Sequence, residues 1–171
     1  HSLPGHVRRR QRLLMIRLWM ATLLMAVPAM ANPTLVFGRL EHTPSNCRIV
    51  YGGRPLECNR LQISASGSSG VRLRFIGDDE NSGVSYQLNF VSLDGDPGSP
   101  LNCDSSGCRL NRRSWNASLI STAWVRFDAQ GLPIGLPDAR TASGRCWIDA
   151  RTISCESHSR NIHDVSAEAQ L

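Results

Sequence analysis

The chain has 171 residues, with 19 arginine or lysine residues against 14 aspartate or glutamate residues. All 19 are arginines, and five of them precede residue 18 in a stretch without acids, so the 14 arginines that remain balance the 14 acids. A domain without net charge lacks the broad positive surface that binds nucleic acid, so we expect no nucleic-acid partner.

The N-terminal 31 residues have the pattern of a cleavable export signal. An arginine-containing start precedes an apolar run over 18–27, and the small-residue sequence Ala-Met-Ala follows at 29–31. This order predicts a signal peptide that is cleaved before Asn32. Because Met15 can serve as an initiator, residues 1–14 would be an upstream or non-native extension. The apolar run is shorter than the roughly 20 residues that cross a bilayer, so we expect no transmembrane span after cleavage.

The rest of the chain has the length of one ordinary domain. We divide the sequence into a signal peptide (1–31), a single β-rich domain (32–156) and a flexible C-terminal tail (157–171). Apolar residues recur in that tail at helical spacing over too short a stretch for a stable helix, so we expect it to be frayed.

Six cysteines follow the leader, and an even number in an exported chain predicts disulfides. The segment 47–58 centres on Gly52-Gly53, a pair suited to a two-residue hairpin turn. Pairing about that turn sets Cys47 opposite Cys58, and on the other face it sets Arg48 opposite Glu57 as an ion pair. We therefore predict a Cys47–Cys58 disulfide.

The other cysteines obey the same symmetry. Cys103 and Cys108 flank an Asp-Ser-Ser-Gly turn, and Cys146 and Cys155 are symmetric about Ala150-Arg151. Ala-Arg is a poor type I′ turn, so a slightly longer loop in the same register is the alternative there. Zinc is the competing interpretation of the six cysteines, but their spacings lack CXXC pairs, so we expect neither metal nor cofactor.

Strands are predicted where apolar and polar residues alternate, as at 71–75 and 84–90. In the run 119–127, the alternation places Leu119, Ala123, Val125 and Phe127 on one face and Trp124 on the other. Shorter strands are expected at 35–40 and 61–64. The predicted fold class is all-β, an antiparallel β-sandwich or small β-barrel with three disulfide-stapled hairpins or turns, following a cleavable signal helix.

The sequence contains no assembled catalytic motif. No GXSXG stretch occurs, and the histidines after the leader are His42, His158 and His163. Asp78, Glu80 and Ser82 resemble part of a calcium loop but lack the later bidentate glutamate, so we interpret them as a solvated turn. We therefore assign no catalytic, cofactor-binding or metal-binding residue.

Three tryptophans are candidates for a ligand or partner surface. Trp124 and Trp147 fall on the polar faces of their segments, and Trp115 lies in a presumed short connection. Exposed tryptophans can stack on sugar rings or form protein contacts. The alternative is that these faces pack under a loop or a second sheet.

The leading functional hypothesis is an exported cell-envelope protein, periplasmic or secreted, that serves as a non-enzymatic binding or structural module. Its partner would be an envelope protein or a glycan. One alternative is a small hydrolase with a loop-built site near 94–100. Another is an assembly subunit or inhibitor that accepts a partner's strand at an open sheet edge.

Overall fold

The computed structural model describes residues 37–66, 70–93, 95, 98–111, 113–159 and 162–171, which all belong to one compact unit, Leu35–Leu171. The predicted signal peptide lies outside these residues. Within the described ranges, no helix has the length and apolar character needed to cross a membrane.

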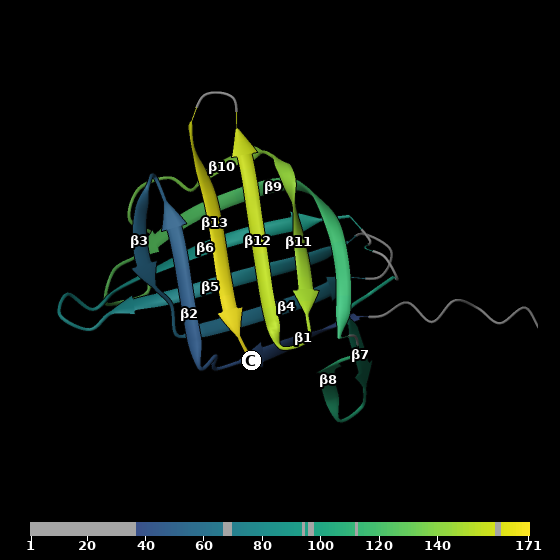
Figure 1. Ribbon diagram of the computed structural model, residues 1–171. Coiled ribbons are helices and arrows are strands. Elements are labelled where there is room, and N and C mark those ends of the chain that lie inside the picture. The colour runs from purple at the N-terminus through teal and green to yellow at the C-terminus, as the bar shows by residue number, and fades with distance from the viewer. Residues whose placement is uncertain (1–36, 67–69, 94, 96–97, 112, 160–161) are drawn as a thin grey trace, which may run out of the picture. The chain divides into compact units, whose positions relative to one another are not determined.

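Thirteen strands account for most of the described chain, and they are labelled in Figure 1. They are β1 (Phe37–His42), β2 (Asn46–Tyr51), β3 (Arg54–Glu57), β4 (Arg60–Ser66), β5 (Val71–Asp79), β6 (Val84–Ser92), β7 (Leu101–Asp104), β8 (Gly107–Leu110), β9 (Ser114–Phe127), β10 (Asp138–Thr141), β11 (Ser143–Asp149), β12 (Thr152–Ser159) and β13 (Ile162–Gln170). The predicted all-β class is confirmed, and every pairing is antiparallel.

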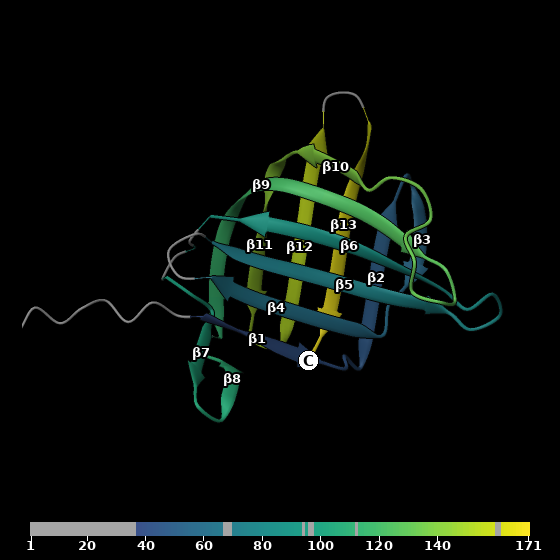
Figure 2. The same ribbon diagram turned by 180° about the vertical axis from the view of Figure 1, so that it is seen from behind.

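Eleven strands form one continuous sheet that folds into two layers. Its order is β1-β4-β5-β6-β9-β11-β12-β13-β2-β3, with β10 added beside β9. Figures 1 and 2 show that β1, β4, β5 and β6 run across β2, β11, β12 and β13, as in an orthogonally packed sandwich. We call the layer with β4–β6 the first layer and the layer with β11–β13 the second layer.

The long strand β9 belongs to both layers. Its first half pairs with β11 and its second half pairs with β6 and β10. The register on β6 shifts between Val91 and Ser92, which leaves Ile120 as an extra residue on β9. A β-bulge of this kind bends a strand and reverses which side chains face inward.

This bulge corrects one sequence prediction. Before Ile120, the odd-numbered residues Trp115, Ala117 and Leu119 are buried. After it, the even-numbered Thr122 is buried, and Trp124 lies on the same face of the strand as Thr122. Leu119 therefore does not share a face with Ala123, Val125 and Phe127. That second half of β9 turns its predicted apolar face away from the core.

The core fills the space between the two layers. The first layer contributes Leu73, Phe75 and Phe90, the two phenylalanine rings meeting edge to face with centroids 5.8 Å apart. The second layer contributes Ile49, Ile148, Ile153 and Ala169, all at most 2% exposed. The alternation predicted for 71–75 is confirmed, since Val71, Leu73 and Phe75 are all buried.

All three predicted disulfides are present. Cys47–Cys58, Cys103–Cys108 and Cys146–Cys155 have Cα separations of 4.9, 4.0 and 4.0 Å. The predicted registers are also confirmed, with Arg48 opposite Glu57 and Ile148 opposite Ile153. Such local covalent links are typical of proteins that reside in oxidising compartments.

The disulfide of the β7–β8 hairpin covers an edge strand. A Cβ atom added at Gly38 of β1 would lie 2.1 Å from Cys108 Sγ, so the hairpin packs directly on this glycine. Edge strands left open are sites of unwanted pairing. The hairpin therefore packs on one face of β1, at one end of the strand order.

The predicted flexible tail is wrong. Residues 162–170 form β13, which pairs with β12 on one side and β2 on the other. Ala167 and Ala169 are at most 4% exposed, and their small side chains pack in the core. Alanine has low strand propensity, which is why the segment does not look like a central strand in the sequence.

The turn between β11 and β12 contains only Ala150 and Arg151, so the longer-loop alternative is wrong. Ala150 has a φ angle of 53°, in the left-handed region where a Cβ atom is strained.

We predict that Ala150→Gly raises the free energy of unfolding by about 1 kcal/mol, because glycine relieves that strain at some cost in chain entropy. Denaturant unfolding without reductant measures the effect. The matched variant Arg151→Gly should instead lose stability, because the Arg151 Nε–H donates to the Leu171 carbonyl oxygen at 3.1 Å. Equal effects of the two changes, or a loss of stability in Ala150→Gly, would contradict this account of the turn.

Candidate functional site

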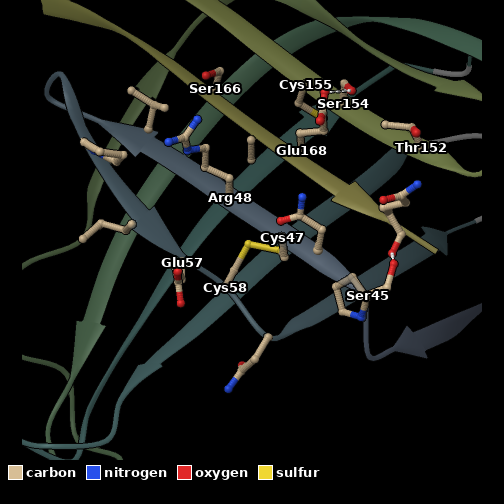
Figure 3. Close-up of a pocket in the computed structure, with 18 of the residues that line it drawn as sticks. Ser45, Cys47, Arg48, Glu57, Cys58, Thr152, Ser154, Cys155, Ser166 and Glu168 are labelled. Carbon is tan, nitrogen blue, oxygen red and sulfur yellow. Dashed lines mark hydrogen bonds between the residues drawn. A yellow bond between two sulfur atoms is a disulfide. The ribbon is translucent and has the colours of Figure 1, made fainter.

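A groove of about 1130 Å³ lies over the outer face of the second layer. Figure 3 shows its floor, where side chains of β2, β12 and β13 lie beside the Cys47–Cys58 disulfide. Arg48 and Glu168 of its lining alternate with buried residues of the core, although the lining also includes the buried Cys47, Cys155 and Ala167. The same registers that bury Ile49 and Ile153 turn Arg48 and Glu168 toward solvent, while Ser154 on the floor of the groove is only 5% exposed.

One row of side chains crosses the groove from strand to strand. The pairings of β11 with β12, β12 with β13, β13 with β2 and β2 with β3 place five residues in register. These residues, in order, are Trp147, Ser154, Glu168, Arg48 and Glu57. A small serine stands between a large indole on one side and longer charged side chains on the other, which makes this part of the face hollow.

The groove floor is polar and carries both signs of charge. The Ser154 hydroxyl donates to Glu168 Oε2 at 3.2 Å, which orients that carboxylate. Arg48 lies between Glu168 and Glu57 in the register. Such a surface offers hydroxyl, carboxylate and guanidinium groups to a ligand with many hydrogen-bonding groups.

Trp147 forms one side of the groove and is half-buried. The Arg145 guanidinium lies over the indole, 4.6 Å from the ring centroid, and its Nε–H donates to Glu156 Oε1 at 2.9 Å. The Arg145 guanidinium, itself held by Glu156 of the neighbouring strand, restricts how the indole moves. Trp147 is therefore presented to the groove in a held orientation.

The other two candidate tryptophans lie elsewhere. Trp115 is 1% exposed in β9, and its Nε1–H donates to the Gly98 carbonyl oxygen at 2.8 Å, so its assignment to a surface connection is wrong. Trp124 faces the interior because of the bulge at Ile120. Its ring stacks on Tyr51 at 4.4 Å and on Tyr86 at 5.6 Å between centroids.

Beside this aromatic stack, Tyr51, Asp138 and Arg140 form a hydrogen-bonded group that links the two layers, and we call this group the clasp. The Tyr51 hydroxyl of β2 donates to Asp138 of β10, and Arg140 donates to the same carboxylate. The two hydrogen bonds, with that from Arg140 the stronger influence, hold the pKa of Asp138 below its usual value. Burial, followed by the hydrogen bond to Asp138, raises the pKa of Tyr51 to about 12. The clasp fixes the β2–β3 hairpin, which forms one wall of the groove.

The remaining sequence candidates do not converge on the groove. His158 Nδ1 lies 3.4 Å from Asp164 Oδ1 at the far end of β12, and the His163 side chain lies outside the described residues. The Asp79 carboxylate accepts hydrogen bonds from Asn81 N and Ser82 Oγ and so closes the β5–β6 turn. In the described part of the chain, no three His, Cys, Asp or Glu side chains group as metal ligands would. Part of the loop 94–100, the proposed hydrolase site, is outside the described residues.

Sequence reasoning missed Arg48, Ser154 and Glu168 as members of one site. Arg48 was recognised only as the partner of Glu57. The missing signal was the alternation of Val165, Ala167 and Ala169 with Ser166 and Glu168, which has the period of a strand. Without that strand, β2 and β12 could not be placed on either side of β13.

Comparison with known proteins gives no relative: no family model, curated protein or solved structure matches this chain.

We predict that Asp138→Asn lowers the stability near pH 7 by about 1 kcal/mol, since it weakens two charge-assisted hydrogen bonds. A carboxyl whose folded pKa is depressed stabilises the fold above its unfolded value, about 3.9, and this contribution is lost as the pH falls through the folded value. The difference between wild type and variant should therefore shrink at acidic pH in denaturant unfolding. A difference that is constant with pH, or absent at pH 7, would show that the clasp does not depend on this charge.

Proposed function

We propose that this protein is an exported, non-enzymatic binding module of the cell envelope, periplasmic or secreted, and that its groove binds a glycan. The observation that carries the proposal is the row from Trp147 to Glu57, which sets an indole beside hydroxyl and charged groups in one open hollow. The site is formed by central strands and is therefore rigid before any ligand arrives. A preformed site loses little entropy when it binds.

The chemistry of a sugar chain matches this row. The C–H face of a sugar ring packs on an indole, while its hydroxyl groups exchange hydrogen bonds with carboxylates and guanidinium groups. Trp147 would supply the stacking surface, and Glu168 and Arg48 would accept and donate hydrogen bonds to the hydroxyl groups. The open groove would allow a chain to extend beyond one ring.

The covalent structure supports the exported location. All six cysteines are joined in short-range disulfides, and two of these staple the hairpins β2–β3 and β11–β12 that border the groove. Such bonds persist where thiols are oxidised, outside the cytoplasm. The signal-peptide pattern of the N-terminal residues supports the same location outside the cytoplasm.

Recognition by a side-chain face fits this protein better than strand addition. In β3, Pro55 faces Val50 at a position between two hydrogen-bonded pairs, so its nitrogen, which has no hydrogen, points to the open edge. The β7–β8 hairpin packs on β1 at the other end of the strand order. The β3 edge therefore carries a proline that discourages a partner's strand, and the β1 end carries the packed hairpin beside it.

The test is isothermal titration of the full chain, with its disulfides formed, against cello-, chito- and maltooligosaccharides and soluble peptidoglycan fragments. We expect at least one to bind and Trp147→Ala to weaken that binding about fivefold, because a stacking aromatic contributes on the order of 1 kcal/mol.

Phe127→Ala is the matched control, since that half-buried aromatic ring of β9 does not line the groove and its loss should leave the affinity unchanged. Absence of binding to every member of the panel, or equal affinity in Trp147→Ala, would contradict the glycan assignment. Thermal unfolding of each variant shows whether the fold is retained.

A further inference from the structure

The loop between β9 and β10 presents an uncharged, apolar surface to solvent. Residues 131–137, with the sequence GLPIGLP, are all exposed, and we call them the apolar loop. Leu132, Ile134 and Leu136 are 62%, 41% and 95% exposed and are three of the five exposed large apolar side chains in the described chain. Their concentration within five residues indicates an interaction surface.

Hydrogen bonds at its base hold the apolar loop in this shape. The Asp128 carboxylate accepts from the amides of Gln130 and Leu132, at 3.0 and 2.8 Å, and the Asp128 amide donates to the Leu132 carbonyl oxygen. The Ile134 amide donates to the Arg126 carbonyl oxygen at 2.8 Å. The exposed side chains therefore project from a fixed backbone.

The apolar surface continues onto the first layer. The bulge at Ile120 turns Ala123, Val125 and Phe127 outward, and Phe127 bridges to Pro133 of the apolar loop. All three β9 side chains are only half-buried. The backbone bridge at Pro133 therefore places the apolar loop next to Phe127 of this strand segment.

We propose that the apolar loop docks the protein on a lipid bilayer by inserting Leu132, Ile134 and Leu136 into the interface of an uncharged membrane. Irregular backbone is costly in an apolar medium unless its polar groups are paired. Here the amides of Leu132 and Ile134 are bonded within the protein, while Pro133 and Pro137 have no amide hydrogen. The backbone at Leu132 and Ile134 can therefore enter the interface with its amides already paired.

Charged side chains near the loop favour one kind of membrane, because among the described residues the acids there outnumber the one exposed cation, Arg126, whose carbonyl oxygen accepts from the Ile134 amide. The β5–β6 turn, with Asp78, Asp79 and Glu80 exposed, adjoins the loop, because a Cβ atom at Gly83 would lie 3.0 Å from Ala129 Cβ. These carboxylates would be repelled by anionic headgroups and are indifferent to zwitterionic ones. A second copy of the chain is a poorer occupant, since the groove identified in the described residues is lined by charged and polar side chains.

Hydrogen–deuterium exchange of the full chain with phosphatidylcholine vesicles tests the proposal, because it reads the loop separately from the N-terminal apolar run. We expect the peptide spanning 128–137 to exchange more slowly with vesicles than without. Leu136→Ser should lose that protection, and the matched variant Leu93→Ser, which removes an exposed leucine elsewhere, should keep it. Adding phosphatidylglycerol should reduce the protection, and raising the salt concentration should restore it by screening.

Unchanged exchange over 128–137 with phosphatidylcholine would overturn the proposal. Protection seen only with phosphatidylglycerol would overturn the choice of an uncharged membrane. Sedimentation without lipid tests whether a second copy of the chain binds the loop. Self-association that Leu136→Ser abolishes would assign the loop to that second copy and overturn the membrane proposal. The inference does not depend on the glycan groove, which lies on the second layer.

Discussion

The register of two disulfide-linked hairpins determines both the inside and the outside of the second layer. Cys47 faces Cys58 and Cys146 faces Cys155, so the residues that share the cysteine face, Ile49 and Ile148, enter the core. The alternate positions, including Arg48 and Trp147, must then face solvent. A slip of one residue would exchange the two sets and remove the core and the groove together.

Local pairings could be derived from the sequence because each is fixed by a few neighbouring residues. Gly52-Gly53 and the facing cysteines suffice to set the β2–β3 register, and the structure agrees with it. The inversion of β9 could not be found in this way, because Ile120 becomes a bulge only through pairing with β6. Trp124 consequently faces the interior and not solvent, and the sequence pattern does not predict its stack with Tyr51 and Tyr86.

The C-terminal strand shows a second limit. Ala167 and Ala169 are weak strand formers, and their burial depends on β12 and β2, which flank them in space but not in sequence. The groove depends on the same non-local pairing, since Glu168 lies between Ser154 and Arg48 only when β13 is central. The candidate site was therefore harder to predict than the disulfides, although one of its residues, Trp147, was singled out.

The two layers provide surfaces of opposite character. The second layer exposes a polar groove between stapled hairpins, while the first layer ends in an apolar loop held by Asp128. Glycan binding at one surface and lipid contact at the other would suit a protein placed at the cell envelope. The groove depends on the strand registers of the second layer, and the loop depends on the hydrogen bonds of Asp128.

Peptide mapping without reduction tests the register most directly. Trypsin can cut after Arg48 between the first two cysteines and after Arg151 between the last two, and cleavage before Asp104 opens the middle pair. The structure predicts linked peptides joining Cys47 to Cys58, Cys103 to Cys108 and Cys146 to Cys155. A link between different hairpins, or six free thiols in protein from its native source, would contradict the account.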